Sequence, residues 1–322
     1  MPRFSRRTVL TGAGSLALAS TTLRAQEQTI KIIYPFPAGG SGDAIARMIA
    51  DHLQKSLRRP VIVENKSGAA GRIGAHAVKD APPDGTVLLF AAASQMTLQP
   101  HIPPNLGYDP FADFIPISRV VTFDVALVVS STSPVRSIRE LVAWLRANPD
   151  HAVYGSPGAG TGAHFAGMKF AKAFDLDLRH VAYRGTPAAL PDVLTGRIPM
   201  YIAASTELLE HQTTGTIRIL ATAGATRSTI LPDVPTFIEN GIDIDATGWF
   251  AFYAPARTPA ALVRRLETEI VTATHVPETH ARILAMGFQP TGTSADELKQ
   301  IQRDEFDRWA LIVKASGYRA ER

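Results

Sequence analysis

The feature that most constrains the fold is a regular alternation between short β-rich runs and helical patterns along the 322 residues. The first run, residues 29–34, leads into a helical pattern in which Ile45, Ile49 and Leu53 recur at four-residue spacing. Further β-rich runs lie at 61–63, 87–91, 126–130, 153–154, 180–183, 200–203 and 217–222. This alternation is typical of α/β folds in which helices cover parallel sheets.

The chain contains no internal repeat, low-complexity tract or long polar linker. With 45% hydrophobic and 19% charged residues, it has enough apolar material for one or two globular domains with substantial cores. Two domains without a linker have to be joined by strands that cross between them. From residue 258 onward, two amphipathic helical patterns look like packing elements for the domain that begins near the N-terminus.

Residues 1–25 have the pattern of a cleavable signal peptide. Arg6 and Arg7 precede a weakly apolar run at 9–19, and Ala25 offers a small residue for cleavage. We therefore expect a twin-arginine-like signal and a soluble protein of the periplasm. The four arginines of this segment account for the whole positive excess, which leaves 29 basic and 29 acidic residues. The mature chain therefore has no charge basis for binding nucleic acid.

Several kinds of catalytic or metal site find no support in the sequence. Cysteine is absent, which excludes disulfides, thiolate metal sites, Cys nucleophiles and a lipoprotein anchor. The nine histidines lack metal-ligand spacing, and residues 39–43 fail the nucleophile-elbow pattern at their last position. We expect no metal and no cofactor.

The loop at residues 35–43 runs from a strand directly into a helix and is rich in proline and glycine. The start of a helix carries up to four unpaired N–H groups and a partial positive charge, so it binds anions without a basic side chain. The alternative is that Asp43 caps its helix and the glycines shape a turn. The candidate binding residues here are Phe36, Ala38, Gly39, Gly40, Ser41 and Asp43.

A second loop of the same kind occupies residues 155–164. Its Gly-Ala-Gly run superficially suggests a dinucleotide fingerprint, but the rest of that pattern is missing, so a second anion site is the better interpretation. A plain tight turn is the alternative, and His164 is either close to a ligand or a buried imidazole. The candidate residues here are Ser156, Gly160, Thr161, Gly162 and His164.

Two further positions are ambiguous. A third glycine-rich run at 67–72 also starts a helix, and close helix–sheet packing explains it better than ligand binding. Arg184 follows the run at 180–183, where it either pairs with a ligand carboxylate or forms a surface salt bridge.

At these loops the chain resembles the Bug family, the substrate-binding subunits of tripartite tricarboxylate transport systems. The likeness covers nearly the whole chain beyond residue 25, and the order and spacing of its motifs are specific. The motifs are residues 34–43 (YPFPAGGSGD), 63–71 (VENKSGAAG), 108–117 (YDPFADFIPI), 183–185 (YRG), 231–236 (LPDVPT) and 249–250 (WF).

The resemblance implies an α/β, type II periplasmic-binding-protein fold with two lobes and a ligand cleft between them. We expect one lobe to comprise residues 26–124 plus 252–322 and the other residues 125–251. Family members typically hold a carboxylate through main-chain amides of the first loop and its counterpart in the other lobe. Ser94 falls where the family often places another ligand contact.

One departure from the family pattern bears on the ligand. Where an acid is usual near the end of the run at 200–203, this chain has Ala203, Ala204 and Ser205. Without that acid we expect a plain or aromatic carboxylate rather than an amino acid.

The expected function is therefore capture of a small carboxylate for delivery to membrane permease subunits, by a monomer that is not an enzyme. The alternatives are a nucleotide-dependent or hydrolytic α/β enzyme, or a ligand-sensing subunit for a membrane signalling protein. The two-loop hypothesis predicts that Gly39→Pro or Gly160→Pro abolishes binding and leaves the fold intact.

Overall fold

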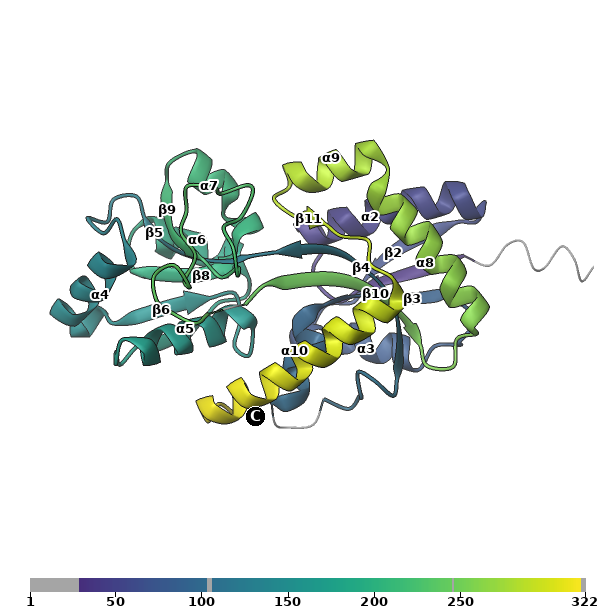
Figure 1. The fold of residues 1–322 in the computed structure, drawn as a ribbon, viewed down its shortest axis with the longest axis horizontal. Helices are drawn as coiled ribbons and strands as arrows, with labels where there is room; N and C mark the ends of the chain where they lie inside the picture. Colours follow the sequence, from purple (N-terminus) through teal and green to yellow (C-terminus); the bar gives the residue numbers. More distant parts are fainter. Residues whose placement is uncertain (1–28, 103–105, 245, 320–322) are drawn as a thin grey trace, which may run out of the picture.

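The computed structural model describes residues 29–102, 106–244 and 246–319, which form two α/β lobes joined by long strands (Figure 1). The predicted signal peptide lies outside these residues. The structure confirms the expected two-lobed α/β architecture.

The first lobe is built on a six-stranded sheet. Its strands, in spatial order, are β11 (Gln289–Pro290), β4 (Phe114–Phe123), β10 (Gly248–Pro255), β3 (Val87–Ala92), β1 (Ile30–Tyr34) and β2 (Val61–Asn65). The first lobe's helices are α2 (Ser41–Leu57), α3 (Arg72–Lys79), α8 (Ala260–His275), α9 (Pro277–Ala285) and α10 (Ala295–Ser316). The sheet is mixed rather than purely parallel, because β10 runs antiparallel to both β3 and β4.

The second lobe is built on a five-stranded sheet. Its strands, in order, are β7 (Arg179–Ala182), β6 (Val153–Ser156), β8 (Met200–Ala204), β5 (Val125–Ser130) and β9 (Ile217–Thr222). The second lobe's helices are α4 (Ile138–Ala147), α5 (Gly162–Ala173), α6 (Thr186–Leu194) and α7 (Leu209–Thr213). Here β5 is the antiparallel member, and it pairs with β8 and β9.

Each sheet separates two hydrophobic cores. In the first lobe, the stripe of Ile45, Ile49 and Leu53 on α2 is fully buried against one face of the sheet. The opposite face packs against α3 and α10. Two helix starts carry side-chain caps: Ser294 forms a complete capping box with Glu297, and Ser137 accepts from the N–H of Glu140.

Three connections join the two lobes and position the site between them. Strand β4 passes into β5 with a single residue between them, and β10 returns from the second lobe to the first. Helix α10 starts in the first lobe and ends beside α5 of the second (Figure 1). A small apolar cluster joins them, formed by Leu98, Ile102, Phe165, Trp309 and Val313. The strand β10 spans the position at which the sequence placed the second lobe boundary, so the exact limits of the lobes remain a proposal.

Candidate functional site

A cavity of about 150 Å³ lies between the two lobes, and residues of both lobes line it. From the first lobe come the turn after β3, the end of β4 and part of α10; from the second come the start of α5, the end of β8 and the approach to β10. The described lining residues are Ala92, Ala93, Ser94, Leu98, Phe123, Val125, Pro157, Thr161, Gly162, Ala163, Ala204, Glu207, Ala246, Thr247, Gly248 and Trp309.

The start of α5 presents main-chain donors to this cavity. Thr161 is the N-cap, and its side chain accepts from the N–H of His164 at 3.2 Å. The first helical hydrogen bond runs from the N–H of Phe165 to the carbonyl of Thr161. The N–H groups of Gly162 and Ala163 therefore have no partner among the described residues, and both residues line the cavity. They form a site where negative charge is favoured.

His164 holds the loop before α5 in shape. The N–H of Gly160 donates to Nδ1 of His164 at 3.1 Å, and Gly160 has a φ of +72°. A ring nitrogen that accepts this bond carries no proton, so His164 is neutral with its proton on Nε2. Burial, together with the neighbouring His180, lowers the pKa of His164 to about 4.

His164 stacks on His180 with ring centroids 3.9 Å apart and an interplanar angle of 16°. Nε2 of His180 lies 2.8 Å from the hydroxyl oxygen of Ser156, which also donates to the carbonyl of Gly158. Burial lowers the pKa of His180 to about 4 as well. The two neutral rings therefore hold the second glycine-rich loop in shape through their hydrogen bonds to Gly160 and Ser156.

The start of α2 in the first lobe is built by the same device. The N–H of Gly39, with a φ of +87°, donates to a carboxylate oxygen of Asp43 at 3.1 Å. Arg47 and Asn65 also donate to Asp43, at 2.9 Å and 2.8 Å. Burial raises the pKa of Asp43, but the hydrogen bonds from Arg47, Asn65 and Gly39 outweigh it and hold the pKa below its usual value.

An aromatic cluster connects the first loop to the cavity. Gly42 packs so closely on the side chains of Tyr34 and Phe250 that an added Cβ would lie 2.3 Å from the Tyr34 hydroxyl oxygen. The ring of Phe250 lies 5.4 Å from that of Phe123, which lines the cavity. The first loop itself contributes no residue to the described lining.

The predicted site residues fall into three groups. Ser94, Thr161 and Gly162 line the cavity. Gly39, Asp43, Gly160, His164 and Ser156 are engaged in the hydrogen bonds that shape the two loops. The others lie apart from the described lining: Phe36 is half-buried, Ala38 and Gly40 are exposed, Ser41 begins α2, Arg184 is exposed, and Ala203 is buried opposite Ala126.

Both ambiguous positions now have a structural setting. Arg184 forms no ion pair among the described residues. The third glycine run packs closely, because Gly71 lies against the side chain of Gln95 and an added Cβ there would approach Nε2 to 2.2 Å. The amide of Gln95 donates to the carbonyl of Gly71 at 3.0 Å. This hydrogen bond connects the third glycine run to the turn after β3, which lines the cavity.

Glu207 is the cavity residue that the sequence analysis missed. It ends the 3₁₀ turn Ser205–Glu207 that directly follows β8 and lies four residues beyond Ala203. The chain lacks an acid at 203–205, but Glu207 brings one into the cavity lining, so the expectation of a plain or aromatic carboxylate stays a prediction. Glu207 stays accessible to water. The protein around it nevertheless desolvates the carboxyl group, which raises the pKa of Glu207, while a hydrogen bond from Thr186 acts to lower it.

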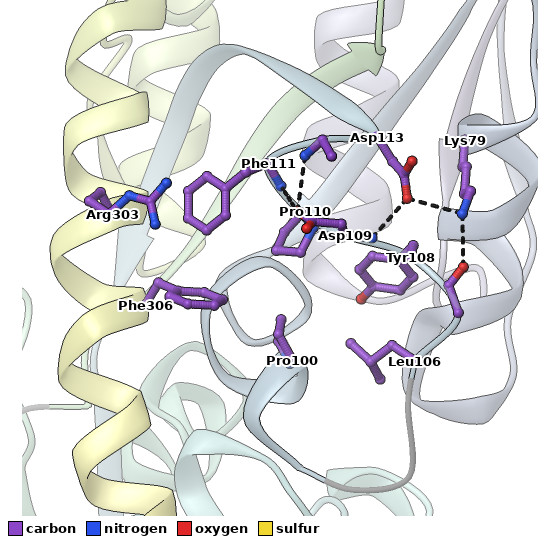
Figure 2. Close-up of a pocket in the computed structure, with 12 residues that line it drawn as sticks. Lys79, Pro100, Leu106, Tyr108, Asp109, Pro110, Phe111, Asp113, Arg303 and Phe306 are labelled. Atoms are coloured by element: carbon purple, nitrogen blue, oxygen red, sulfur yellow. Dashed lines mark hydrogen bonds and ion pairs between the residues drawn. The ribbon is translucent and has the colours of Figure 1, made fainter.

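A larger depression of about 850 Å³ lies on the first lobe (Figure 2). Its polar groups are already paired: Asp113 accepts from Lys79 at 3.1 Å, and Asp109 accepts from the N–H of Phe111 at 2.7 Å. The guanidinium of Arg303 lies 3.7 Å above the centre of the Phe111 ring. The motif at 108–117 thus builds a turn whose polar groups hydrogen-bond to one another and to Lys79, which makes the interlobe cavity the better candidate site.

Neither a metal cluster nor a membrane-spanning helix is present among the described residues. Within residues 29–102, 106–244 and 246–319, no group of three or more His, Asp or Glu side chains is placed to hold a metal ion. Of the helices described, none combines the length and the apolar character that crossing a bilayer requires.

Comparisons with known proteins bear on the family and the fold. The profile of the TctC family, described as "Tripartite tricarboxylate transporter family receptor", matches residues 45–318. Protein BugT of Bordetella pertussis is 32% identical over 290 residues, 89% of each chain. The structure of periplasmic binding protein BugD is 28% identical with a TM-score of 0.82 and covers 92% of this chain and 99% of that one. The structure of R. palustris Rpa4515 with adipate is 27% identical with a TM-score of 0.84, covering 90% and 97%.

Proposed function

We propose a function from one premise, which is that the chain belongs to the family of tripartite tricarboxylate transporter receptors. We infer that it captures a small organic carboxylate between its lobes in the periplasm and presents the closed complex to membrane permease subunits. Family membership confirms the resemblance to the Bug proteins. Because the family and its solved neighbours are binding proteins, it also confirms that the chain is not an enzyme.

One observation carries the proposal for the ligand. The N-terminal end of α5 borders the interlobe cavity, and Gly162 and Ala163 line it with main-chain N–H groups that the helix cannot use. A carboxylate is one of the small anions that such a helix start binds well. Rpa4515, which shares the fold, was solved with adipate, a dicarboxylate.

The energies needed are ordinary. Micromolar capture takes about 8 kcal/mol. A hydrogen bond to a charged group contributes about 1.5–3 kcal/mol, and a helix start adds about 0.3–2 kcal/mol. A few main-chain donors in a cavity that excludes water therefore suffice, after the costs of ordering the ligand are subtracted.

Closure follows from the placement of these contacts. The cavity is lined from both lobes, so a ligand that touches both sides favours the arrangement in which both sets of contacts form. The closed arrangement then differs in shape from the empty one, and a membrane partner can distinguish the two.

The experiment removes one N–H from each helix start without disturbing the helix. Gly162 is the first residue of α5 and Ser41 the first residue of α2, and proline is well tolerated at that position. The preceding residues, Thr161 and Gly40, already have the extended backbone that proline requires. We expect Gly162→Pro to raise the Kd for a bound dicarboxylate about tenfold or more, measured by titration calorimetry, because Gly162 lines the cavity; Ser41→Pro, outside the described lining, should raise it less.

Alanine at the same positions is the matched control, because it keeps the N–H group. No atom lies within 4 Å of a Cβ built on Gly162, so Gly162→Ala fits without a clash. Unchanged affinity in Gly162→Pro would contradict the helix-start model. The variants suggested by the sequence alone are poor tests, because proline cannot adopt the positive φ of Gly39 or Gly160.

A further inference from the structure

Glu207 is a carboxylate in a cavity that we propose for an anionic guest, which poses an electrostatic problem. Among the described residues, no Lys, Arg or His forms an ion pair with it. A guest with carboxylates alone would meet a like charge there without compensation. The protein therefore keeps an acid in the cavity that a plain dicarboxylate does not need.

The position of Glu207 is fixed by a buried chain of hydroxyl groups. The hydroxyl of Thr186, the first residue of α6, donates to Oε2 of Glu207. The hydroxyls of Thr186 and Tyr201 lie 3.1 Å apart. Because a threonine hydroxyl has a single proton, the Tyr201 hydroxyl must be the donor to Thr186 in this arrangement. Thr186 and Tyr201 are 1% and 0% exposed, so the chain is held rigidly.

This chain of donors leaves Glu207 as an acceptor. An ionised carboxylate has two oxygens and only accepts hydrogen bonds, and the described contacts occupy Oε2 alone. Across the cleft, Tyr34 of the first lobe lies close enough for the charge of Glu207 to contribute to its raised pKa, after the larger effect of burial. Glu207 therefore acts at the meeting of the two lobes, with Oε1 left for a donor.

We propose that Glu207 is a specificity-determining residue that receives the ammonium group of a zwitterionic ligand, such as an amino dicarboxylic acid, while the start of α5 receives a carboxylate. This inference rests on the proposed function and names the ligand class. The ammonium supplies the missing positive charge, and its N–H groups donate to the free carboxylate oxygen. The shared cavity lining of Glu207 and Gly162 allows one small molecule to reach both.

The test compares ligands that differ only in the ammonium group. L-aspartate and succinate, and L-glutamate and glutarate, are titrated calorimetrically into the wild-type protein and into Glu207→Gln. We expect the wild type to bind the better amino acid about tenfold or more tightly than its deaminated partner. Glu207→Gln keeps the shape but loses the charge, and we expect it to abolish this preference and to bind the plain acid equally well or better.

The matched control is Glu210→Gln, which changes an exposed glutamate of the neighbouring α7 outside the described cavity lining. It should leave every affinity unchanged. Malate tests whether a hydroxyl donor suffices, and tighter binding of malate than of aspartate would overturn the ammonium assignment. Equal binding of amino and deaminated acids, or a preference that survives in Glu207→Gln, would also overturn it and leave the proposed function standing. Failure of all these acids to bind would overturn the ligand class inferred here, whereas the proposed function would fail only if no small carboxylate of any kind bound.

Discussion

Acidification should destabilise the protein through His164, the ring that supports the loop before α5. The side chain is buried, with 4% exposed, and its Nδ1 accepts from the N–H of Gly160. Protonation would place a charge in this buried site and turn the acceptor into a donor that faces another donor. The folded protein therefore resists protonation, which lowers the pKa of His164 from 6.5 to about 4.

The sign and size of the effect follow from linkage. Because the folded pKa lies below the unfolded one, the unfolded chain binds more protons between these values, so stability falls as the pH drops from about 6.5 towards 4. At about 1.4 kcal/mol for each pKa unit, the full loss from His164 is roughly 3 kcal/mol. At about pH 5, about 2 kcal/mol of it has been lost.

The assay is urea denaturation at about pH 7.5 and about pH 5, for the wild type and for His164→Asn. Asparagine keeps an oxygen that accepts from Gly160, as Asp43 accepts from Gly39 in the first loop, but it does not titrate. Other titrating groups are common to both proteins. The wild type should therefore lose about 2 kcal/mol more than the variant on acidification.

An equal loss in the two proteins would refute the argument that His164 is held neutral by burial. His180→Gln is the companion variant, because His180 stacks on His164 and its own pKa is lowered by burial. Because His180 is only half-buried, replacing it should reduce the pH dependence of the free energy of unfolding less than replacing His164 does.

Substitutions at two further positions, Asp43 and Gly167, test how the first loop and the second core are built. Asp43→Ala should cost about 1–3 kcal/mol in the free energy of unfolding by urea, because the N–H of Gly39 loses its acceptor; Asp43→Asn should cost less, and an equal cost would contradict this role. Gly167→Ala should destabilise by about 1–3 kcal/mol, since its Cβ would lie 2.1 Å from the ring of Tyr154. Gly162→Ala on the same helix should leave the thermal midpoint unchanged, and equal effects of the two would show that the close packing is not rigid.

The sequence predicted the local elements well. Eight β-rich runs were expected, and each coincides with an observed strand to within about two residues. The helices that follow the loops at 35–43 and 155–164 were also expected, because loop composition and apolar periodicity depend on residues a few positions apart.

Two long strands were not identified from the sequence. Strands β4 (Phe114–Phe123) and β10 (Gly248–Pro255) pair with each other antiparallel in the middle of the first sheet. Their sequences lack a clean alternation of apolar and polar residues, since β10 is buried along nearly its whole length. Sequence reasoning required strands that cross between the lobes, but only the pairing of residues more than 100 positions apart located them.

The amino-acid sequence by itself determined the alternating α/β architecture and the two glycine-rich loops that start α2 and α5. The tertiary structure decided which N–H groups of those loops are free, because Asp43 and His164 consume those of Gly39 and Gly160. It also placed Glu207 in the cavity beside residues from the other lobe. The physical reason is the range of the interactions: helix starts and turns are set by neighbours in the chain, whereas a cavity and its charges arise only when distant segments pack together.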